Sequence, residues 1–382
     1  MKHGLYLLTK SKVEQFEDDW LDGQQIDLVT TTFTAGFHDV VGITWEPGAG
    51  ASNTRQSLQE TFGNTDRNMV IAYEFAGENR GDYGPPARGD FDAKYRSFAR
   101  DLVSVGMGDA YIAPNHEFSL EWGSKSAYDE PGNYRDGYAR VVREMQSVDG
   151  ADFTFCYAPS QNRIGVADEA WPVQSDYWPS DEPAPIVTPS FYDAGNGVYP
   201  DDPSSLTESE LEQVRDEAWN QKHKPVLDMW QAFADQRGAK MGFREWGCAT
   251  EAWTNNGGLD NPEFIHRVLD YAGQHDWVFQ TYWNGDSPKH RIYPPEESGL
   301  PDVGQAWRDR VLSDLNNTVD SGGSTDSTDT ESGTDDTVSA YGGYSRPDEG
   351  TLDWHVPLND NFASIEEDIK DLAERIEQIE ST

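Results

Sequence analysis

The chain has 382 residues, 36% of them hydrophobic, so it can bury one large core or two ordinary ones. Its charge is unusual, because 69 acidic residues against 29 basic ones leave a formal net charge of −40. So acidic a surface repels a phosphate backbone, which excludes a general nucleic-acid-binding protein. The sequence has no run of about 18 apolar residues, and the apolar run Leu5–Leu8 is too short for a secretion signal, so we expect neither membrane insertion nor a signal peptide.

The acidic residues are spread along the whole chain. Residues 313–382 hold 18 acidic and 3 basic residues, so residues 1–312 keep a net charge of −25. A folded domain of this charge repels itself in dilute salt, whereas the Debye length falls to about 3 Å near molar ionic strength. We therefore expect a salt-adapted protein of haloarchaeal or halovirus origin, in which most acidic clusters are solvated surface.

Strand-like and helix-like segments alternate over the first 312 residues. Nine segments read as buried strands: Gly4–Leu8, Asp27–Phe33, Val40–Trp45, Met69–Phe75, Ala110–Glu117, Phe153–Ala158, Ile186–Tyr192, Lys240–Trp246 and Trp277–Trp283. Helical stretches follow at Phe91–Val105, Tyr134–Ser147, Glu208–Asn220, Pro225–Gln236, Pro262–Gln274 and Val303–Leu312. This alternation predicts an α/β fold, a (β/α)8 TIM barrel. Nine candidates for eight places mean that Val40–Trp45 or Met69–Phe75 is an accessory element.

The C-terminal part has a different composition. Every residue from Asp320 to Asp336 is Asp, Glu, Ser, Thr or Gly, which is typical of a flexible linker. We place the barrel at 1–312, an acidic linker at 313–343 and a C-terminal module at 344–382. Six apolar residues at steps of three and four form a coiled-coil-type seam there: Phe362, Ile365, Ile369, Leu372, Ile376 and Ile379. We expect this short helix to pair with copies of itself or with a partner, the alternative being a lone amphipathic helix.

Polar and aromatic residues stand where several of the expected strands end. They are Trp45, His116, Glu117, Tyr192, Glu245, Trp246 and Trp283. The carboxyl ends of the strands of an α/β barrel converge on one face, so these side chains should surround one pocket. Two glutamates across an aromatic cleft suit glycosidic cleavage, since one protonates the leaving oxygen and the other attacks or activates water. Aromatic faces also stack on the apolar faces of sugar rings.

Several of these segments together resemble glycoside hydrolase family 26, best known for β-mannanases. The resemblance covers roughly 40–312 and rests on Gly42–Pro47, Gly89–Asp92, Phe98–Leu102, Pro114–Phe118 with Trp122, Tyr134–Arg143, Phe155–Pro159 and Phe243–Gly247. It implies a retaining barrel enzyme with its acid/base after the fourth strand and its nucleophile after the seventh. Glu117 then corresponds to the acid/base and Glu245 to the nucleophile, with their carboxyl groups about 5–5.5 Å apart.

The resemblance also implies roles around the two glutamates. His116 would shape the site, Tyr192 would hydrogen-bond to the nucleophile, and Trp283 would form an aromatic floor beneath the sugar. We add three further substrate-binding candidates: Trp45, Trp122 and Trp246. Glu46 and Glu74 are candidates for a supporting or subsite role, Glu121 is the rival for the role of Glu117, and Arg244 either lowers the pKa of Glu245 or packs the barrel interior.

The chain departs from the family pattern beside the acid/base. Phe118-Ser119-Leu120 replaces a small Met-Asn-Gly-like run, and Ala113 stands where the family usually has Arg. These changes bear on subsite contacts and hence on mannan specificity, but they leave both carboxylates in place. Because Cys156 and Cys248 lack the spacing of a metal or redox motif, we expect free thiols, and we expect neither a metal nor a cofactor.

The tail carries a second resemblance. Gly350–Ile365 is similar to a short module of viral structural and tail-associated proteins, with the core Trp354-His-Val-Pro-Leu-Asn-Asp-Asn-Phe362. It suggests attachment to a virion tail or surface appendage, or an extracellular location, with a cytoplasmic location as the alternative. The alternative is the start of an ordinary helix, in which Trp354 packs on Phe362.

The sequence thus favours a retaining glycoside hydrolase acting on a β-linked polysaccharide or cell-surface glycan. Its partners would be that glycan and, through the C-terminal helix, other copies or a virion structural protein. A catalytically inactive glycan-binding adhesin on a virus particle is the alternative, and an intracellular structural protein is a third reading.

Overall fold

The computed structural model describes residues 1–7, 10–33, 67–76, 81–119, 126–127, 129–161, 176–179, 185–194, 199–249, 257–285 and 287–321. The chain divides into one unit of Met1–Gly323 and another of Ser324–Thr382, and every described residue belongs to the first. The strand candidate Val40–Trp45, the expected linker beyond residue 321 and the whole C-terminal module therefore lie outside the described residues.

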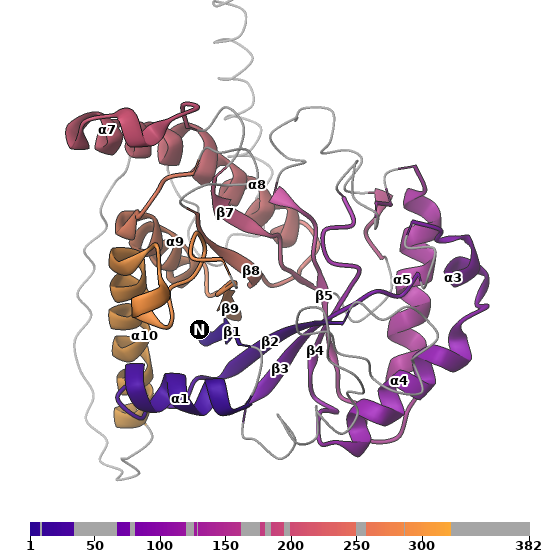
Figure 1. Ribbon diagram of the computed structural model, residues 1–382. Coiled ribbons are helices and arrows are strands. Elements are labelled where there is room, and N and C mark those ends of the chain that lie inside the picture. Colours follow the sequence, from indigo (N-terminus) through magenta and orange to yellow (C-terminus); the bar gives the residue numbers. More distant parts are fainter. Residues whose placement is uncertain are drawn as a thin grey trace, which may run out of the picture. The chain divides into compact units, whose positions relative to one another are not determined.

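Nine parallel strands form a single curled sheet (Figure 1). They are β1 Lys2–Tyr6, β2 Leu28–Phe33, β3 Asn68–Tyr73, β4 Tyr111–Pro114, β5 Thr154–Tyr157, β6 Ile186–Val187, β7 Phe191–Asp193, β8 Phe243–Cys248 and β9 Phe279–Tyr282. Their order across the sheet is β6-β5-β4-β3-β2-β1-β9-β8-β7. The first and last strands along the chain, β1 and β9, are thus neighbours, as a barrel requires.

Strands β6 and β7 are two parts of one barrel strand. Between them, the Ser190 amide donates to the Pro159 carbonyl at 2.9 Å, so the ladder with the β5 side continues through the break. On the other edge, Val187 in β6 pairs with Met241 at the entry to β8, which closes the sheet. Nine strands therefore fill eight positions, and β8 occupies the seventh.

The sheet and its helices fit the α/β barrel expected from the sequence. The segment Met69–Phe75, considered as an accessory element, instead contains the barrel strand β3, which pairs with β2 and β4. With Val40–Trp45 set aside, the remaining eight strand candidates each contain one barrel position.

Helices connect the strands and cover the sheet. They are α1 Lys10–Trp20, α3 Gly84–Arg88, α4 Asp92–Ser104, α5 Pro131–Gln146, α7 Glu208–Ala218, α8 Lys224–Asp235, α9 Pro262–Gln274 and α10 Pro301–Ser321. A π-helical turn, η4 Trp219–His223, joins α7 to α8, and two short 3-10 turns lie at η3 Pro203–Ser205 and η5 Pro295–Glu297. In Figure 1, α4 and α5 flank one side of the sheet, and α9 and α10 flank the other. Among the described helices, none is both long and apolar enough to span a bilayer.

Helix α9 shows why these segments are helical. Asn261 caps its first turn, its side-chain oxygen accepting from the Phe264 amide, and Pro262 occupies the first turn, where its missing N–H is not needed. Phe264, Ile265, Val268 and Leu269 recur at helical spacing and are all buried against the sheet. Helix α10 likewise buries apolar residues at helical spacing, but it continues to Ser321, beyond the expected domain end at residue 312.

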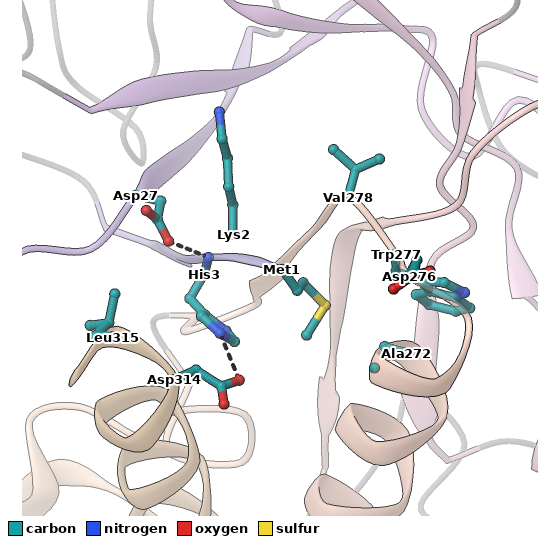
Figure 2. A pocket seen from close by; sticks show the side chains of 11 residues that line it. Met1, Lys2, His3, Asp27, Ala272, Asp276, Trp277, Val278, Asp314 and Leu315 are labelled. Atoms are coloured by element: carbon teal, nitrogen blue, oxygen red, sulfur yellow. Dashed lines mark hydrogen bonds and ion pairs between the residues drawn. The ribbon is translucent and has the colours of Figure 1, made fainter. Parts of the chain in front are cut away.

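A cavity of about 430 Å³ lies at the end of the barrel where β1 and β9 begin (Figure 2). The buried His3 spans its wall: Nδ1 lies 3.1 Å from the Gln280 side-chain nitrogen, and Nε2 lies 3.1 Å from an Asp314 oxygen. Because Gln280 can only donate there, Nδ1 accepts and Nε2–H donates to Asp314. This hydrogen bond is the main cause of the lowered pKa of Asp314. The contact fixes α10 to the amino end of the barrel, the end that serves stability in this fold.

Candidate active site

Glu117 follows β4, the fourth barrel strand, in an unusual backbone conformation. Asn115 and Glu117 both lie in the left-handed region, with φ of 47° and 60°, which is uncommon for residues other than glycine. The Glu117 amide donates to the Ala158 carbonyl at 2.7 Å, and the Asn115 side-chain oxygen accepts from the Phe75 amide at 2.9 Å. The neighbouring strand ends thus hold a conformation that is unfavourable by itself, as is common where a side chain must be aimed at a functional site.

Glu245 lies at a β-bulge in β8. The pairing of β8 with β9 shifts between Phe243 and Trp246, which pair with Gln280 and Tyr282, so three steps along β8 match two along β9. The Phe243 and Trp246 rings stack 5.7 Å apart in the core, so both side chains lie on the same side of the strand. The two residues between them, Arg244 and Glu245, therefore turn together to the opposite side, the barrel interior.

Three of the expected site residues, His116, Glu117 and Tyr192, lie around a fourth, Glu245. The Tyr192 hydroxyl donates to its Oε1 at 2.7 Å, and His116 Nε2 lies 3.1 Å from its Oε2. The same His116 nitrogen lies 3.7 Å from Oε2 of Glu117. One carboxylate oxygen of Glu117 and one of Glu245 lie within 4.8 Å of each other. Arg244 also contacts Glu245, since its guanidinium donates to Oε2.

The surroundings of Glu245 favour its ionised form. Burial alone would raise its pKa, but His116 and Arg244, together with the Tyr192 hydrogen bond, outweigh burial and hold the pKa well below its usual range. Burial, assisted by the charge of Arg244, lowers the pKa of His116, whereas the charges of Glu245 and Glu117 oppose this shift. Burial and the charge of Glu245 raise the pKa of Tyr192, so its hydroxyl keeps the proton that it donates.

The two carboxylates differ in their access to solvent. The Glu117 side chain is 28% exposed, whereas that of Glu245 is 8% exposed. One buried, ionised carboxylate and one accessible carboxylate at this separation can divide the work of attack and proton transfer.

An aromatic pair borders this cluster. Trp283, directly after β9, is half-buried and packs against the cluster formed by Tyr192, Ala194 and Ala249. Tyr6, at the end of β1, stacks on Trp283 with ring centroids 4.1 Å apart. The His290 ring lies 6.0 Å from that of Tyr192. Neither Tyr6 nor His290 is among the candidates predicted from the sequence. Tyr6 ends a strand and could have been found by its position, whereas His290 follows no strand.

The expectation for Trp246 is wrong. Its side chain is fully buried, packs against Phe243 and Tyr282, and donates to the Gln280 side chain at 2.6 Å. It therefore belongs to the core and offers no face to a sugar. Glu74 is buried at the end of β3.

The remaining candidates, Trp45, Trp122, Glu46 and Glu121, lie outside the described residues. Both Cys156 and Cys248 are free and buried, as expected.

The same cluster has the spacing of a metal site. His116, Glu117 and Glu245 each offer one ligand atom, all within 4.8 Å of one another, so these three residues could hold a cation. The guanidinium of Arg244 already binds Oε2 of Glu245 and opposes a second positive charge there. The arrangement suits acid–base chemistry without a metal better than it suits a metal centre.

No family model matches the chain, and no curated protein matches it. Among solved structures, the chain resembles a double mutant of the Cellulomonas fimi endo-β-1,4-mannanase, with a TM-score of 0.55 and 16% identity over 81% of this chain and 70% of that one. It also resembles the catalytic domain of the Bacillus sp. JAMB-750 GH26 endo-β-1,4-mannanase, with a TM-score of 0.52 and 16% identity over 81% of this chain and 85% of that one. For a Pseudomonas stutzeri endoglucanase the TM-score is 0.50, with 13% identity over 81% of this chain and 93% of that one. These likenesses show that the chain has an α/β barrel fold similar to that of family 26 mannanases.

Proposed function

We propose that this chain is a retaining glycoside hydrolase of β-linked polysaccharide or cell-surface glycan. The observation that carries the proposal is the approach of one carboxylate oxygen of Glu117 to one of Glu245, within 4.8 Å, at the ends of the fourth and seventh barrel strands. A retaining pair needs about 5–5.5 Å between carboxyl groups, whereas an inverting pair stands about 6.5–9.5 Å apart to admit a water. The spacing favours direct attack by one carboxylate.

The reaction then proceeds by double displacement. Ionised Glu245 attacks the anomeric carbon while Glu117 gives its proton to the leaving glycosidic oxygen, so the bond to the leaving sugar breaks as an ester to Glu245 forms. Glu117, now ionised, takes a proton from water, and the resulting hydroxide equivalent attacks the ester and frees Glu245. Tyr192 and His116 orient Glu245 throughout, and Trp283 offers a ring for sugar stacking.

We propose β-1,4-mannan as the first substrate to test, because two of the similar structures are named as endo-β-1,4-mannanases. The departures beside Glu117 count less against mannan than the sequence suggests. Phe118 is fully buried and stacks on Tyr134 at 4.1 Å, and Ser119 accepts from the Ser160 amide at 2.9 Å. Both residues serve packing next to the site.

The test is hydrolysis of β-mannan, β-glucan and host cell-surface glycan in molar salt. We expect Glu117→Gln and Glu245→Gln each to lower kcat by about 10²–10⁴-fold or more, since each removes one partner of the proton transfer or attack. Glu263→Gln, at an exposed carboxylate paired with Arg267, is the matched control and should keep full activity. NMR of the first product should show the starting anomeric configuration, and an inverted product would refute the mechanism.

The alternative, an inactive adhesin, predicts a different result in the same experiment. Glycan binding that survives both substitutions, without turnover of any substrate, would favour it. We further propose, from the sequence of the C-terminal module alone, that the chain is carried on a virion of a haloarchaeal virus or is otherwise extracellular. Purified particles that lack the protein would refute the virion location.

A further inference from the structure

A second buried polar cluster lies directly behind the candidate active site. Strand β7 ends with Tyr192 and Asp193, and consecutive residues of a strand face opposite sides. Tyr192 therefore turns inward to Glu245, while Asp193 turns outward beneath the helices. The Asp193 side chain is 0% exposed, so its carboxylate depends entirely on protein partners.

Three side chains from separate segments meet that carboxylate. The Tyr199 hydroxyl donates to its Oδ1, and the Asn261 amide nitrogen donates to its Oδ2 at 2.7 Å. His223 Nε2 lies 3.0 Å from Oδ1, and the His223 side chain is 1% exposed. Tyr199 follows β7, His223 belongs to η4 and Asn261 caps α9, so one carboxylate ties together three elements.

The π-helical turn explains how His223 reaches Asp193. Pro225, in the first turn of α8, has no N–H to continue the regular helical ladder, and the chain forms the wider turn η4 just before it. His223 ends that turn and packs between Phe264 and Phe191, at centroid distances of 5.3 and 5.7 Å. Such turns are frequent at functional sites, and this one supplies a buried partner to the strand that carries Tyr192.

The backbone of Asp193 is held as firmly as its side chain. Its carbonyl accepts from the Gly258 amide at 2.9 Å, and Ala194 forms an antiparallel bridge with Gly257. A Cβ at Gly258 would lie 2.0 Å from Oδ2 of Asp193, so only glycine permits this approach. The chain that returns from β8 to α9 is thus attached to the end of β7.

We propose that Asp193 is a positioning residue: its buried contacts with Tyr199, His223 and Asn261 fix the end of β7 so that the Tyr192 hydroxyl stays in hydrogen-bond distance of Glu245. A purely structural Asp193 would support stability alone. A positioning Asp193 acts on Glu245 through Tyr192, so replacing Asp193 must no longer affect Glu245 once the Tyr192 hydroxyl is removed.

The first test needs no substrate. The coupling between Tyr192 and Glu245 is measured by chemical unfolding in molar salt, with Tyr192→Phe, Glu245→Gln and the double variant. We expect a coupling on the order of tenfold in the unfolding equilibrium constant in the wild-type background, and none in an Asp193→Asn background. Tyr199→Phe, which removes one donor to Asp193, is the milder variant if Asp193→Asn does not fold, and it should reduce the coupling.

Asp260→Asn is the matched control. Asp260 directly precedes Asn261 in the chain, but its carboxylate accepts from the Asp302 and Val303 amides of α10. It should lower stability and leave the Tyr192–Glu245 coupling unchanged. An undiminished coupling in Asp193→Asn or Tyr199→Phe, or an equal loss in Asp260→Asn, would overturn the proposal.

The second test is kinetic and rests on the proposed hydrolase function. Asp193→Asn should lower kcat by on the order of tenfold with KM unchanged, and should have no further effect in a Tyr192→Phe enzyme. Loss of coupling without any turnover in the wild type would support the positioning role and count against the hydrolase. Turnover in the wild type, with additive effects of Asp193→Asn and Tyr192→Phe on kcat, would support the hydrolase and count against the positioning role.

Discussion

At the scale of single residues, Arg244 sets the chemistry of Glu245. Its side chain is 1% exposed, and its guanidinium contacts the carboxylate that follows it in the chain. Together with His116 it holds the pKa of Glu245 well below its usual range, and its charge also helps to lower the pKa of His116. A buried ion pair of this kind stabilises the charged form of each partner but leaves an uncompensated charge if one partner is removed.

Replacement of Arg244 should therefore change the pH dependence of activity. Attack requires ionised Glu245, which is present above its pKa, so the acid limb of kcat/KM should lie at low pH in the wild type. Arg244→Met should raise that pKa and move the acid limb to higher pH, whereas Arg244→Lys, which keeps the charge, should move it less. Profiles of kcat/KM between about pH 3 and pH 8 test this, and an unmoved acid limb in Arg244→Met would contradict it.

The same substitution should change how stability depends on pH. A carboxyl group whose pKa is lower in the folded chain stabilises the fold above its unfolded pKa of about 4.3, and this contribution is lost as the pH falls toward the folded value. Loss of the buried pair should cost about 3–5 kcal/mol at neutral pH. Unfolding free energies measured at neutral and acidic pH should thus differ less in Arg244→Met than in the wild type.

The strand-end rule brought out Glu117, His116, Tyr192 and Glu245 as candidates, and the structure places them together. The rule works because a barrel gathers the carboxyl ends of all its strands on one face. It failed at Trp246, because the bulge that turns this side chain into the core depends on pairing with β9 and leaves no mark in the local sequence.

At the scale of elements, the bulge in β8 depends on a neighbouring strand. The Thr281 hydroxyl of β9 donates to the Arg244 carbonyl and also lies 3.3 Å from that of Phe243. Thr281 is fully buried, so these carbonyl groups have no access to water through that side. Its hydroxyl compensates the backbone that the extra residue disturbs.

Thr281→Val, which has nearly the same shape but no hydroxyl, should destabilise the bulge. We expect a loss of about 1–3 kcal/mol of unfolding free energy, because a buried carbonyl group loses its donor. We also expect kcat to fall with little change in KM, because Glu245 would be aimed less accurately. Thr281→Ser keeps the hydroxyl and should retain kcat, and a wild-type kcat in Thr281→Val would show that the bulge needs no such support.

Most elements followed from apolar patterning. The single run Ile186–Tyr192 was expected as one strand, and the ladder along β5 shows that β6 and β7 do act as one. The sequence pattern predicts helices only between the later strands and does not predict helix α1. The length of α10 was underestimated because its last turns are anchored by Leu315 in the core and by Asp314 at His3, contacts that exist only in the folded chain.

At the scale of the whole molecule, repulsion among acidic residues should dominate the response to salt. The net charge is −40, and several described ion pairs, such as Lys224–Asp228 and Arg88–Asp90, are exposed. Salt weakens those pairs, but each contributes at most about 1 kcal/mol, and the same salt also screens the repulsion among the 69 acidic residues.

The melting temperature should therefore rise between about 0.2 M and about 3 M KCl. The rise should be steepest below about 1 M, where the Debye length shrinks most, and a more gradual increase above that would report exclusion of salt from the surface. Thermal unfolding followed by circular dichroism at a series of salt concentrations gives the curve. A flat or falling melting temperature would contradict the expected adaptation to concentrated salt.

The bulge in β8 also means that the environment of Glu245 depends on the number of residues in the strand as well as on their identity. If Arg244 were deleted, two steps along β8 would match two steps along β9, so Phe243 and Trp246 would stay on the core side and Glu245 alone would face the barrel interior. The extra residue therefore leaves the two aromatic rings where a regular strand would put them, and it places the Arg244 guanidinium beside the carboxylate of Glu245. A single-codon deletion here would thus keep the alternation of the core side chains and remove the charged partner of Glu245.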